Sequence, residues 1–162
     1  MQGLWLKSVT TTSATLADLV PADWNSGAIR EEPDGKRYRL FKNVTAASGT
    51  IAVSLVLEGS TWDGAILGSI IYTTVTKDAI GVTQTSYNGG AASGVVPAAH
   101  YFWAQVGGVG DVTGTFTVDL PITGSATDGH AADAAATDTL NAIGTALQTK
   151  SEAVGKVLLN IA

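Results

Sequence analysis

The chain has 162 residues, no cysteine, two histidines and a formal net charge of −5, and charged residues make up 14% of it. The missing cysteines exclude disulfides and thiolate metal sites. An acidic chain is a weak ligand for nucleic acid, because phosphate neutralisation supplies most of that affinity. No stretch reaches the roughly 18 apolar residues of a membrane-spanning helix, so an apolar composition with so little charge predicts a surface that contacts other chains.

The first 35 residues follow neither the period of a strand nor that of a helix. Pro33 and the turn-forming pair Asp34-Gly35 interrupt the segment. Trp5 and Trp24 nonetheless need a place to be buried. We therefore expect an extended N-terminal arm over residues 1–35 that docks on a neighbouring chain, with folding back on its own domain as the alternative.

From Lys36 onward the sequence shows the period of two that is typical of strands. Tyr38 and Leu40 alternate with Arg37 and Arg39, which predicts that the first pair points inward and the second shares an outer face. The clearest alternation spans residues 112–120. Further predicted strands cover residues 50–57, 66–76, 80–85, 100–106, 142–148 and 154–161. Turn signals separate them at residues 62–64, 88–90, 107–110 and 128–129. The predicted core comprises Ile51, Val53, Leu55, Phe116, Val118, Leu120, Val157 and Leu159.

About eight short strands at this spacing predict an all-β domain over residues 36–162, a small antiparallel β-barrel or β-sandwich of β-tulip or jelly-roll type. The alanine-rich stretch at residues 131–136 predicts either one short helix or a flexible loop. A short echo links Ala79-Ile80-Gly81-Val82 with Ala142-Ile143-Gly144-Thr145. Two similar hairpins that close one barrel would explain the echo.

Few residues qualify for chemistry. His100 and His130 could each pair with Asp111 or Asp128, but acid–base catalysis needs oriented partners, and their surroundings favour a rim histidine and a loop histidine. Two isolated histidines also lack the local spacing of a tetrahedral metal site. We therefore expect no enzymatic activity, no metal and no cofactor.

The basic cluster at residues 36–42 is the one charged feature of note. Its interleaved aromatic residues are typical of a track for single-stranded nucleic acid. Inward Tyr38 and Leu40 would leave only Arg37 and Arg39 outside, however, and an acidic chain favours docking on an acidic protein surface. The predicted contact residues are Leu4, Trp5, Leu6, Trp24, Ile29, Arg37 and Arg39.

Five short motifs follow one another along residues 38–161. They are Tyr-Arg-x-x-x-Asn at 38–43, Ile-Gly-Val-x-Gln at 80–84, Tyr-x-Trp-x-Gln-Val-x-Gly at 101–108, Thr-Asp-Gly at 127–129 and Ile-Gly-x-Ala-Leu at 143–147. This order resembles that of the small decoration (cement) proteins on the heads of tailed bacteriophages. The first 35 residues match no motif of that family.

The resemblance implies a β-rich knob, often trimeric, that sits on the outer capsid where major capsid subunits meet and clamps them against internal DNA pressure. In such proteins an N-terminal arm commonly reaches a neighbouring subunit or the capsid floor. The expected partners are thus the major capsid protein and further copies of the chain in a homotrimer, without nucleic acid or membrane. The expected location is the outer capsid surface of the virion, after synthesis in the host bacterial cytoplasm.

Three other interpretations stay open. The chain could be a head fibre, tail or baseplate component of the same kind of particle. It could be a carbohydrate-binding β-sandwich in which Tyr87, Tyr101 and Trp103 form a stacking platform. An enzyme of cupin-like or hydrolase type would need His100 and His130 to converge in one pocket.

Overall fold

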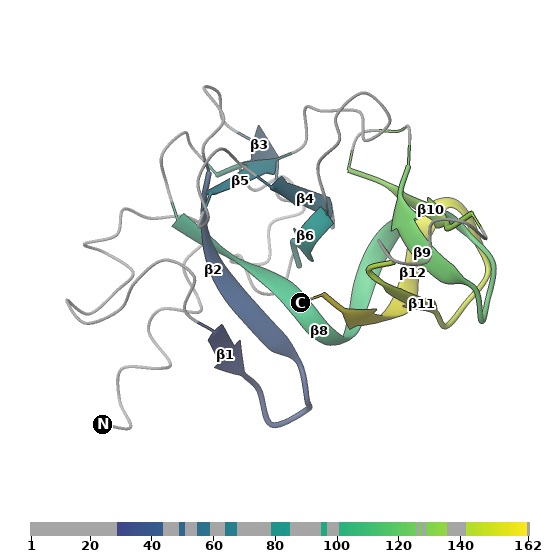
Figure 1. Cartoon of the computed structure of the whole chain (residues 1–162), viewed down its shortest axis with the longest axis horizontal. Coiled ribbons are helices and arrows are strands. Elements are labelled where there is room, and N and C mark those ends of the chain that lie inside the picture. The colour runs from purple at the N-terminus through teal and green to yellow at the C-terminus, as the bar shows by residue number, and fades with distance from the viewer. Residues whose placement is uncertain are drawn as a thin grey trace.

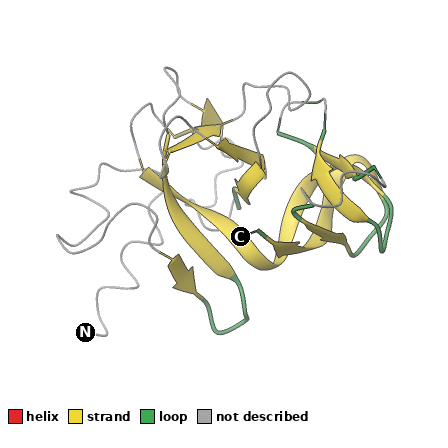
Figure 2. Cartoon of the chain, viewed as in Figure 1, coloured by secondary structure: helices red, strands yellow, loops and turns green. Residues whose placement is uncertain are grey.

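The computed structural model describes residues 29–43, 49–50, 55–58, 64–67, 79–84, 95–96, 101–125, 127, 129–135 and 142–161. Within these ranges every regular element is a strand (Figure 2), and none of these residues belongs to a helix that could cross a membrane. The strands are β1 (Ile29–Glu31), β2 (Arg37–Asn43), β3 (Gly49–Thr50), β4 (Leu55–Glu58), β5 (Gly64–Leu67), β6 (Ala79–Val82), β7 (Val95–Val96), β8 (Tyr101–Phe116), β9 (Pro121–Gly124), β10 (Ala131–Asp133), β11 (Gly144–Ala146) and β12 (Lys150–Asn160).

Ten of these strands form one sheet that closes on itself twice. The first barrel has the order β2, β5, β4, β6 and β8, and β8 pairs back to β2. The second has the order β8, β10, β9, β11 and β12, and β12 pairs back to β8. The long strand β8 is therefore a wall of both barrels, and Figure 1 shows it passing from one to the other. The all-β barrel class predicted from the sequence is confirmed.

The two barrels have the same strand connectivity. In each, the first strand in chain order pairs in parallel with the third, and the third pairs antiparallel with the second. The second then pairs antiparallel with the fourth, the fourth with the fifth, and the fifth with the first. The predicted antiparallel sheet thus differs from the structure at one parallel pair per barrel, β2–β5 and β8–β10.

The sequence echo marks the fourth strand of each barrel. Ala79–Val82 is β6 of the first barrel, and residues 142–145 lead into β11 of the second. The prediction that two similar hairpins close a single barrel is wrong, because the two copies of the echo lie in different barrels, one in each. Both glycines of the echo lie at close contacts: a Cβ on Gly81 would lie 2.8 Å from the Cβ of Ala104, and one on Gly144 would overlap the carbonyl of Leu158.

The predicted glycine turn at residues 107–110 is wrong, since β8 continues through it. β8 pairs with β2 up to Gly107 and with β12 from Gly107 onward, so this stretch is where the strand changes partners. Gly108 has a φ of 78°, a conformation that glycine adopts without steric cost. A Cβ on Gly108 would also lie 2.7 Å from the carbonyl oxygen of Gly35. The glycines therefore allow β8 to bend and leave room for the β1–β2 turn to pack against it.

The barrel interiors merge into one hydrophobic cluster that includes residues from both. Phe116, Val157 and Leu159 are buried there, which confirms their prediction as core. Ile51 and Val53 lie outside the described residues, and of Leu55 only the backbone, in β4, is described.

Val118 and Leu120 are not core residues, contrary to the prediction: they are 41% and 43% exposed. The strand ends at Phe116, and the chain reverses through Asp119, which has a φ of 67°, before Pro121 begins β9. The alternation of residues 112–120 thus spans a strand and a turn.

The alanine-rich segment forms strand β10 over Ala131–Asp133, so the predicted helix or loop is wrong for these residues. β10 pairs with both β8 and β9. A Cβ on Gly114 of β8 would overlap the Ala131 backbone. Small residues are therefore needed for this close strand contact, and tertiary pairing overrides the helical preference of alanine.

Two buried glutamines hold the junction of the barrels together. The amide of Gln84, just after β6, donates to the carbonyl of Asp111 at 2.8 Å and accepts from the N–H of Asp111 at 3.1 Å. Gln105, which is fully buried, donates to the carbonyl of Gly107 at 2.9 Å. Buried backbone groups need such partners, so these side chains fix the path of β8 between the barrels.

Replacing either glycine of the echo with alanine should destabilise the protein. We expect Gly81→Ala and Gly144→Ala each to lower the free energy of unfolding by about 1–3 kcal/mol, the usual cost of overpacking, although alanine is otherwise favoured over glycine in a strand. Thr145→Ala, on the exposed side of β11, is the matched control and should change it little. Chemical denaturation measures all three, and alanine variants as stable as the control would contradict the close contacts.

Candidate interaction surfaces

The β1–β2 hairpin carries the described part of the predicted arm. β1 pairs antiparallel with β2, with Ile29 opposite Arg39, and the turn between them uses Gly35 at a φ of 83°. Residues 29–31 therefore belong to the sheet, and residues 32–35 form the turn that leads into β2. Ile29 is 60% exposed, whereas residues 1–28, with Leu4, Trp5, Leu6 and Trp24, lie outside the described part of the chain.

Acidic neighbours neutralise part of the basic charge of this hairpin. Arg30 lies 2.6 Å from Glu32, and the ammonium of Lys36 lies 2.6 Å from the carboxylate of Asp34. The side-chain hydrogen bond from Lys36 holds the pKa of Asp34 below its usual value. The basic cluster thus offers an acidic partner less charge than the sequence indicates.

Arg39 does not lie on a free outer face, contrary to the prediction. It is opposite Ala104 in the β2–β8 ladder, and its guanidinium carbon lies 5.3 Å from the centre of the Phe41 ring. Ala104 and Phe41 are both fully buried, and the Nε of Arg39 is buried without a hydrogen-bond partner. Arg39 is therefore half-buried in a cation–π arrangement.

Arg37 lies over the stretch where β8 changes partners. A Cβ on Gly107 would lie 2.6 Å from its Nε, so the guanidinium occupies the space that this glycine leaves. Tyr38 and Leu40 are buried, as predicted, and burial raises the pKa of the Tyr38 hydroxyl. Because both faces of β2 are covered at its centre, the hairpin arginines serve packing as well as charge.

A second surface lies on the outside of β8 and β12. Val109 and Leu158 are directly opposite each other and are 42% and 48% exposed. Next to them Lys156 lies 2.8 Å from Asp111, and its outer neighbour Val154 is 47% exposed. The sequence holds a signal for this surface. Val157 and Leu159 point inward, so the alternation of a strand places the apolar Leu158 between them on the outer face.

A shallow groove of about 510 Å³ adjoins this surface beside Leu158. Pro121, Thr145 and Asn160 line it, and none of the described residues around it is charged or aromatic. It therefore offers van der Waals contacts and backbone polar groups to a partner, and no group for acid–base chemistry.

His130 lies beside the turn between β9 and β10. Its Nδ1 is 3.4 Å from a carboxylate oxygen of Glu152, which attracts the ring only when the histidine is charged. Glu152 has a φ of 49° and also accepts a hydrogen bond from Thr115. The predicted partner Asp111 instead pairs with Lys156. His100 and Asp128 lie outside the described residues.

The predicted stacking platform for carbohydrate, formed by Tyr87, Tyr101 and Trp103, is not supported at Trp103. Trp103 is 2% exposed, so its ring cannot stack on a sugar at the surface. Tyr87 and the side chain of Tyr101 lie outside the described residues. Within the described part of the chain, no group of three or more acidic or histidine side chains could hold a metal ion.

The environment of Arg39 yields a test of its structural role. We expect Arg39→Met to unfold with a free energy equal to the wild-type value or up to about 2 kcal/mol higher. The lost cation–π contact is worth about 0.5–1 kcal/mol, whereas removing a buried N–H without a partner gains about 1–3 kcal/mol. Thermal and urea unfolding measure the difference. A clear loss of stability in Arg39→Met, with Arg39→Lys unchanged, would show that the charge itself is needed.

No protein-family model matches the sequence. No curated protein matches it either. Among solved structures the chain is similar to the N base of the head fibre gp8.5 of bacteriophage phi29, with 12% sequence identity and a TM-score of 0.45. The match covers 76% of this chain and 94% of that one.

Proposed function

We propose that the chain is a structural component of a tailed-bacteriophage particle, without enzymatic activity. The proposal rests on the order of motifs along residues 38–161, which resembles that of head decoration proteins. The structure gives most of these motifs a physical role, because four of the five lie on or directly beside strands that build the two barrels.

The observation that carries the proposal is the position of the motif residues at the barrel junction. Gln84, the last residue of the second motif, bonds to the backbone of Asp111. Gln105 and the glycines of the third motif lie where β8 passes from β2 to β12. The resemblance therefore includes residues that lie at the junction of the two barrels and bond to the shared strand.

The exterior also suits a component that contacts other chains. Large apolar side chains stay exposed on a framework of closed barrels, as on the outside of β8 and β12. Exposed apolar surface of this kind marks contact with other proteins. A rigid framework lowers the entropy that is lost when such a surface docks.

In its finer form, we propose a decoration protein that binds the major capsid protein on the outside of the head and assembles as a homotrimer. A head fibre base is the second candidate, because the similar solved structure bears that name. Both candidates are binding proteins, and they differ in whether the chain stabilises the shell or carries a projection.

Binding to phage heads tests the proposal. The purified full chain should co-sediment with heads that lack it, prepared from the phage whose genome carries its coding sequence, and not with heads of an unrelated phage. A clamp between capsid subunits should raise the temperature at which DNA-filled heads release DNA, whereas a fibre base should leave that temperature unchanged. Cryo-EM of the loaded heads would locate the chain and count its copies.

Failure of the chain to bind any part of that phage particle would contradict the proposal as a whole. Binding at the tail or baseplate would retain the structural role and exclude both head candidates. Density for a monomer at each seat would exclude the homotrimer.

A further inference from the structure

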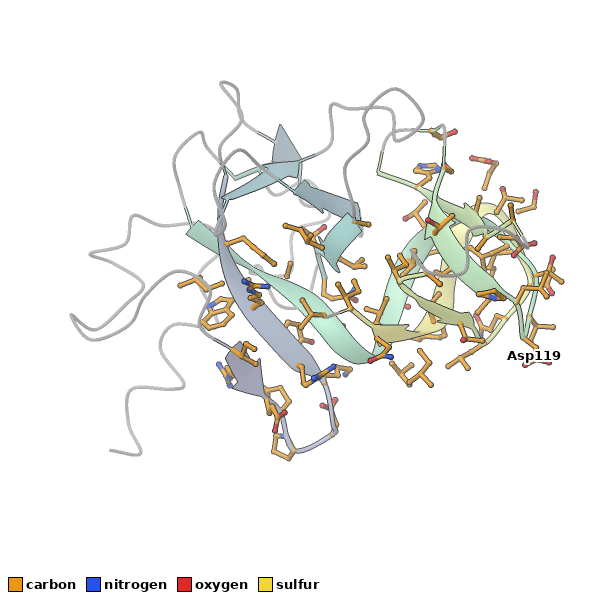
Figure 3. The ribbon with its side chains drawn as sticks, in the orientation of Figure 1. Asp119 is labelled. Carbon is orange, nitrogen blue, oxygen red and sulfur yellow. The ribbon has the colours of Figure 1, made fainter. Side chains whose placement is uncertain are left out.

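The outer face of the first barrel holds a second group of buried apolar side chains. Leu40 of β2 and Trp103 of β8 are directly opposite each other and are 0% and 2% exposed. Neither is part of the hydrophobic cluster of described residues that fills the two barrels, whereas their chain neighbours Phe41 and Ala104 are. Because successive side chains of a strand point to opposite faces, Leu40 and Trp103 lie on the outside of the barrel wall, and Figure 3 shows side chains on both sides of β2. We call Tyr38, Leu40 and Trp103 the outer cluster.

The outer cluster needs a cover of its own. The described strands that contact β2 extensively are β1, β5 and β8, and each of them pairs with it edge to edge. Strands that pair along an edge lie in the plane of the sheet and leave its faces open. At the Tyr38 end, the pairing adds Arg30 and Gln105 to this face. Leu40 and Trp103 need a further layer, which the described strands do not supply.

The register of β1 directs the start of the chain to this position. Ile29 is opposite Arg39 and β1 is antiparallel to β2, so the chain before Ile29 comes from beside Leu40. From Lys42 onward the same edge of β2 is occupied by β5, because β8 takes the other edge along its whole length. The chain before β1 therefore has to leave this edge near Leu40, next to the outer cluster.

The residues that precede Ile29 suit such a departure. Asn25-Ser26-Gly27 is a turn-forming stretch, and Trp24 comes just before it. Five residues of chain span at most about 17 Å, whereas neighbouring strands lie only about 5 Å apart. Trp24 is thus within reach of Leu40 on one strand and of Trp103 on the next. Its ring brings about 150–250 Å² of surface for burial.

We propose that residues 24–28 fold back over the first barrel of their own chain and that Trp24 covers the outer cluster. The contact is apolar, and the rings of Trp24 and Trp103 add an offset or edge-to-face interaction to the gain from burial. The contact goes beyond the proposed function, because it lies within one chain and forms whatever partner that chain binds. It assigns Trp24 to the fold and leaves the residues before it for contact with a neighbouring chain.

The same segment of a second copy is a poorer occupant of this face. The chain's own segment starts beside Leu40, which gives it a high effective concentration at the outer cluster. A segment from another copy would have to displace it and would also lose the translational and rotational freedom of a separate molecule. The short connection to β1 therefore favours the chain's own segment.

A double-mutant cycle tests the contact. Trp24→Ala should lower the midpoint of thermal unfolding by at least about 4 °C, since a buried aromatic side chain is lost from a chain of this size. In a Leu40→Ala background the additional shift should fall to less than half, because the two side chains share one contact. Leu159→Ala, a buried leucine inside the second barrel, is the matched control background and should leave the full shift in place.

Two results of the cycle would overturn the contact. One is an unchanged midpoint in Trp24→Ala, and the other is an equal additional shift in both backgrounds. Either would mean that another segment covers the outer cluster. If Leu40→Ala does not fold, the milder Leu40→Val takes its place in the cycle.

A spin label at residue 26 shows where the segment lies in the folded chain. The chain has no cysteine, so Ser26→Cys carries a single nitroxide label. The label should broaden the NMR signals of the Leu40 methyl groups and the Trp103 indole. The matched control is a label at Val118→Cys, an exposed position beside Asp119 at the outer end of the second barrel (Figure 3), and it should leave these signals sharp.

Mixed samples distinguish the chain's own segment from that of a neighbour. Spin-labelled chains without isotopes are unfolded and refolded together with isotope-labelled chains that carry no spin label, and the signals should then stay sharp. Broadening in this mixture would assign the cover to a second copy and overturn the proposal. Sharp signals in chains that carry both labels would exclude residues 24–28 as the cover. None of these readouts requires binding to heads, so they stand apart from the proposed function.

Discussion

The structure depends on one strand that serves as a wall of two barrels. Every backbone N–H and C=O that β8 buries needs a partner, and no single neighbouring strand provides partners along all of its 16 residues. β2 provides them as far as Gly107, and β12 provides them from there on. The change of partner requires a bend at which side chains would collide, and glycines occupy this stretch. Gln84 and Gln105 hold the backbone beside the bend by hydrogen bonds to Asp111 and Gly107.

Sharing a wall also explains how such short strands form a stable interior. Several strands of the second barrel have only three or four residues, and strands of that length are marginal unless a hydrophobic face is covered. Because β8 continues from one barrel into the next, the two interiors pack as one cluster, with Phe41 and Val82 at one end and Ile122 and Val157 at the other. The repeated connectivity and the echo at Gly81 and Gly144 indicate that both barrels meet the same close-packing requirement in the same way.

Which side chains a partner could contact depends more on burial than on charge. The basic cluster is the most prominent charged feature of the sequence, yet Asp34 neutralises Lys36, and Arg39 is half-buried against the Phe41 ring. The exposed aliphatic residues of β12 and of the β8–β9 turn, which holds Val118 and Leu120, are less conspicuous in the sequence, because nearby residues of the same kind are buried. These residues are exposed because they lie either beyond the end of a strand or on the outer face of a barrel wall.

The sequence by itself determined the strand class, most strand positions, the burial of Tyr38, Leu40, Phe116, Val157 and Leu159, and the turn at Asp34-Gly35. These follow from alternation and turn chemistry, which act between residues close along the chain. Only the tertiary structure decided that β8 runs through its glycines, that Ala131–Asp133 is a strand, that Val118 and Leu120 lie in an exposed turn, and that Arg39 is half-buried. The physical reason is that alternation shows which side chains share a face of one strand, whereas the partner strand, its direction and its register arise from contacts between residues far apart in the sequence.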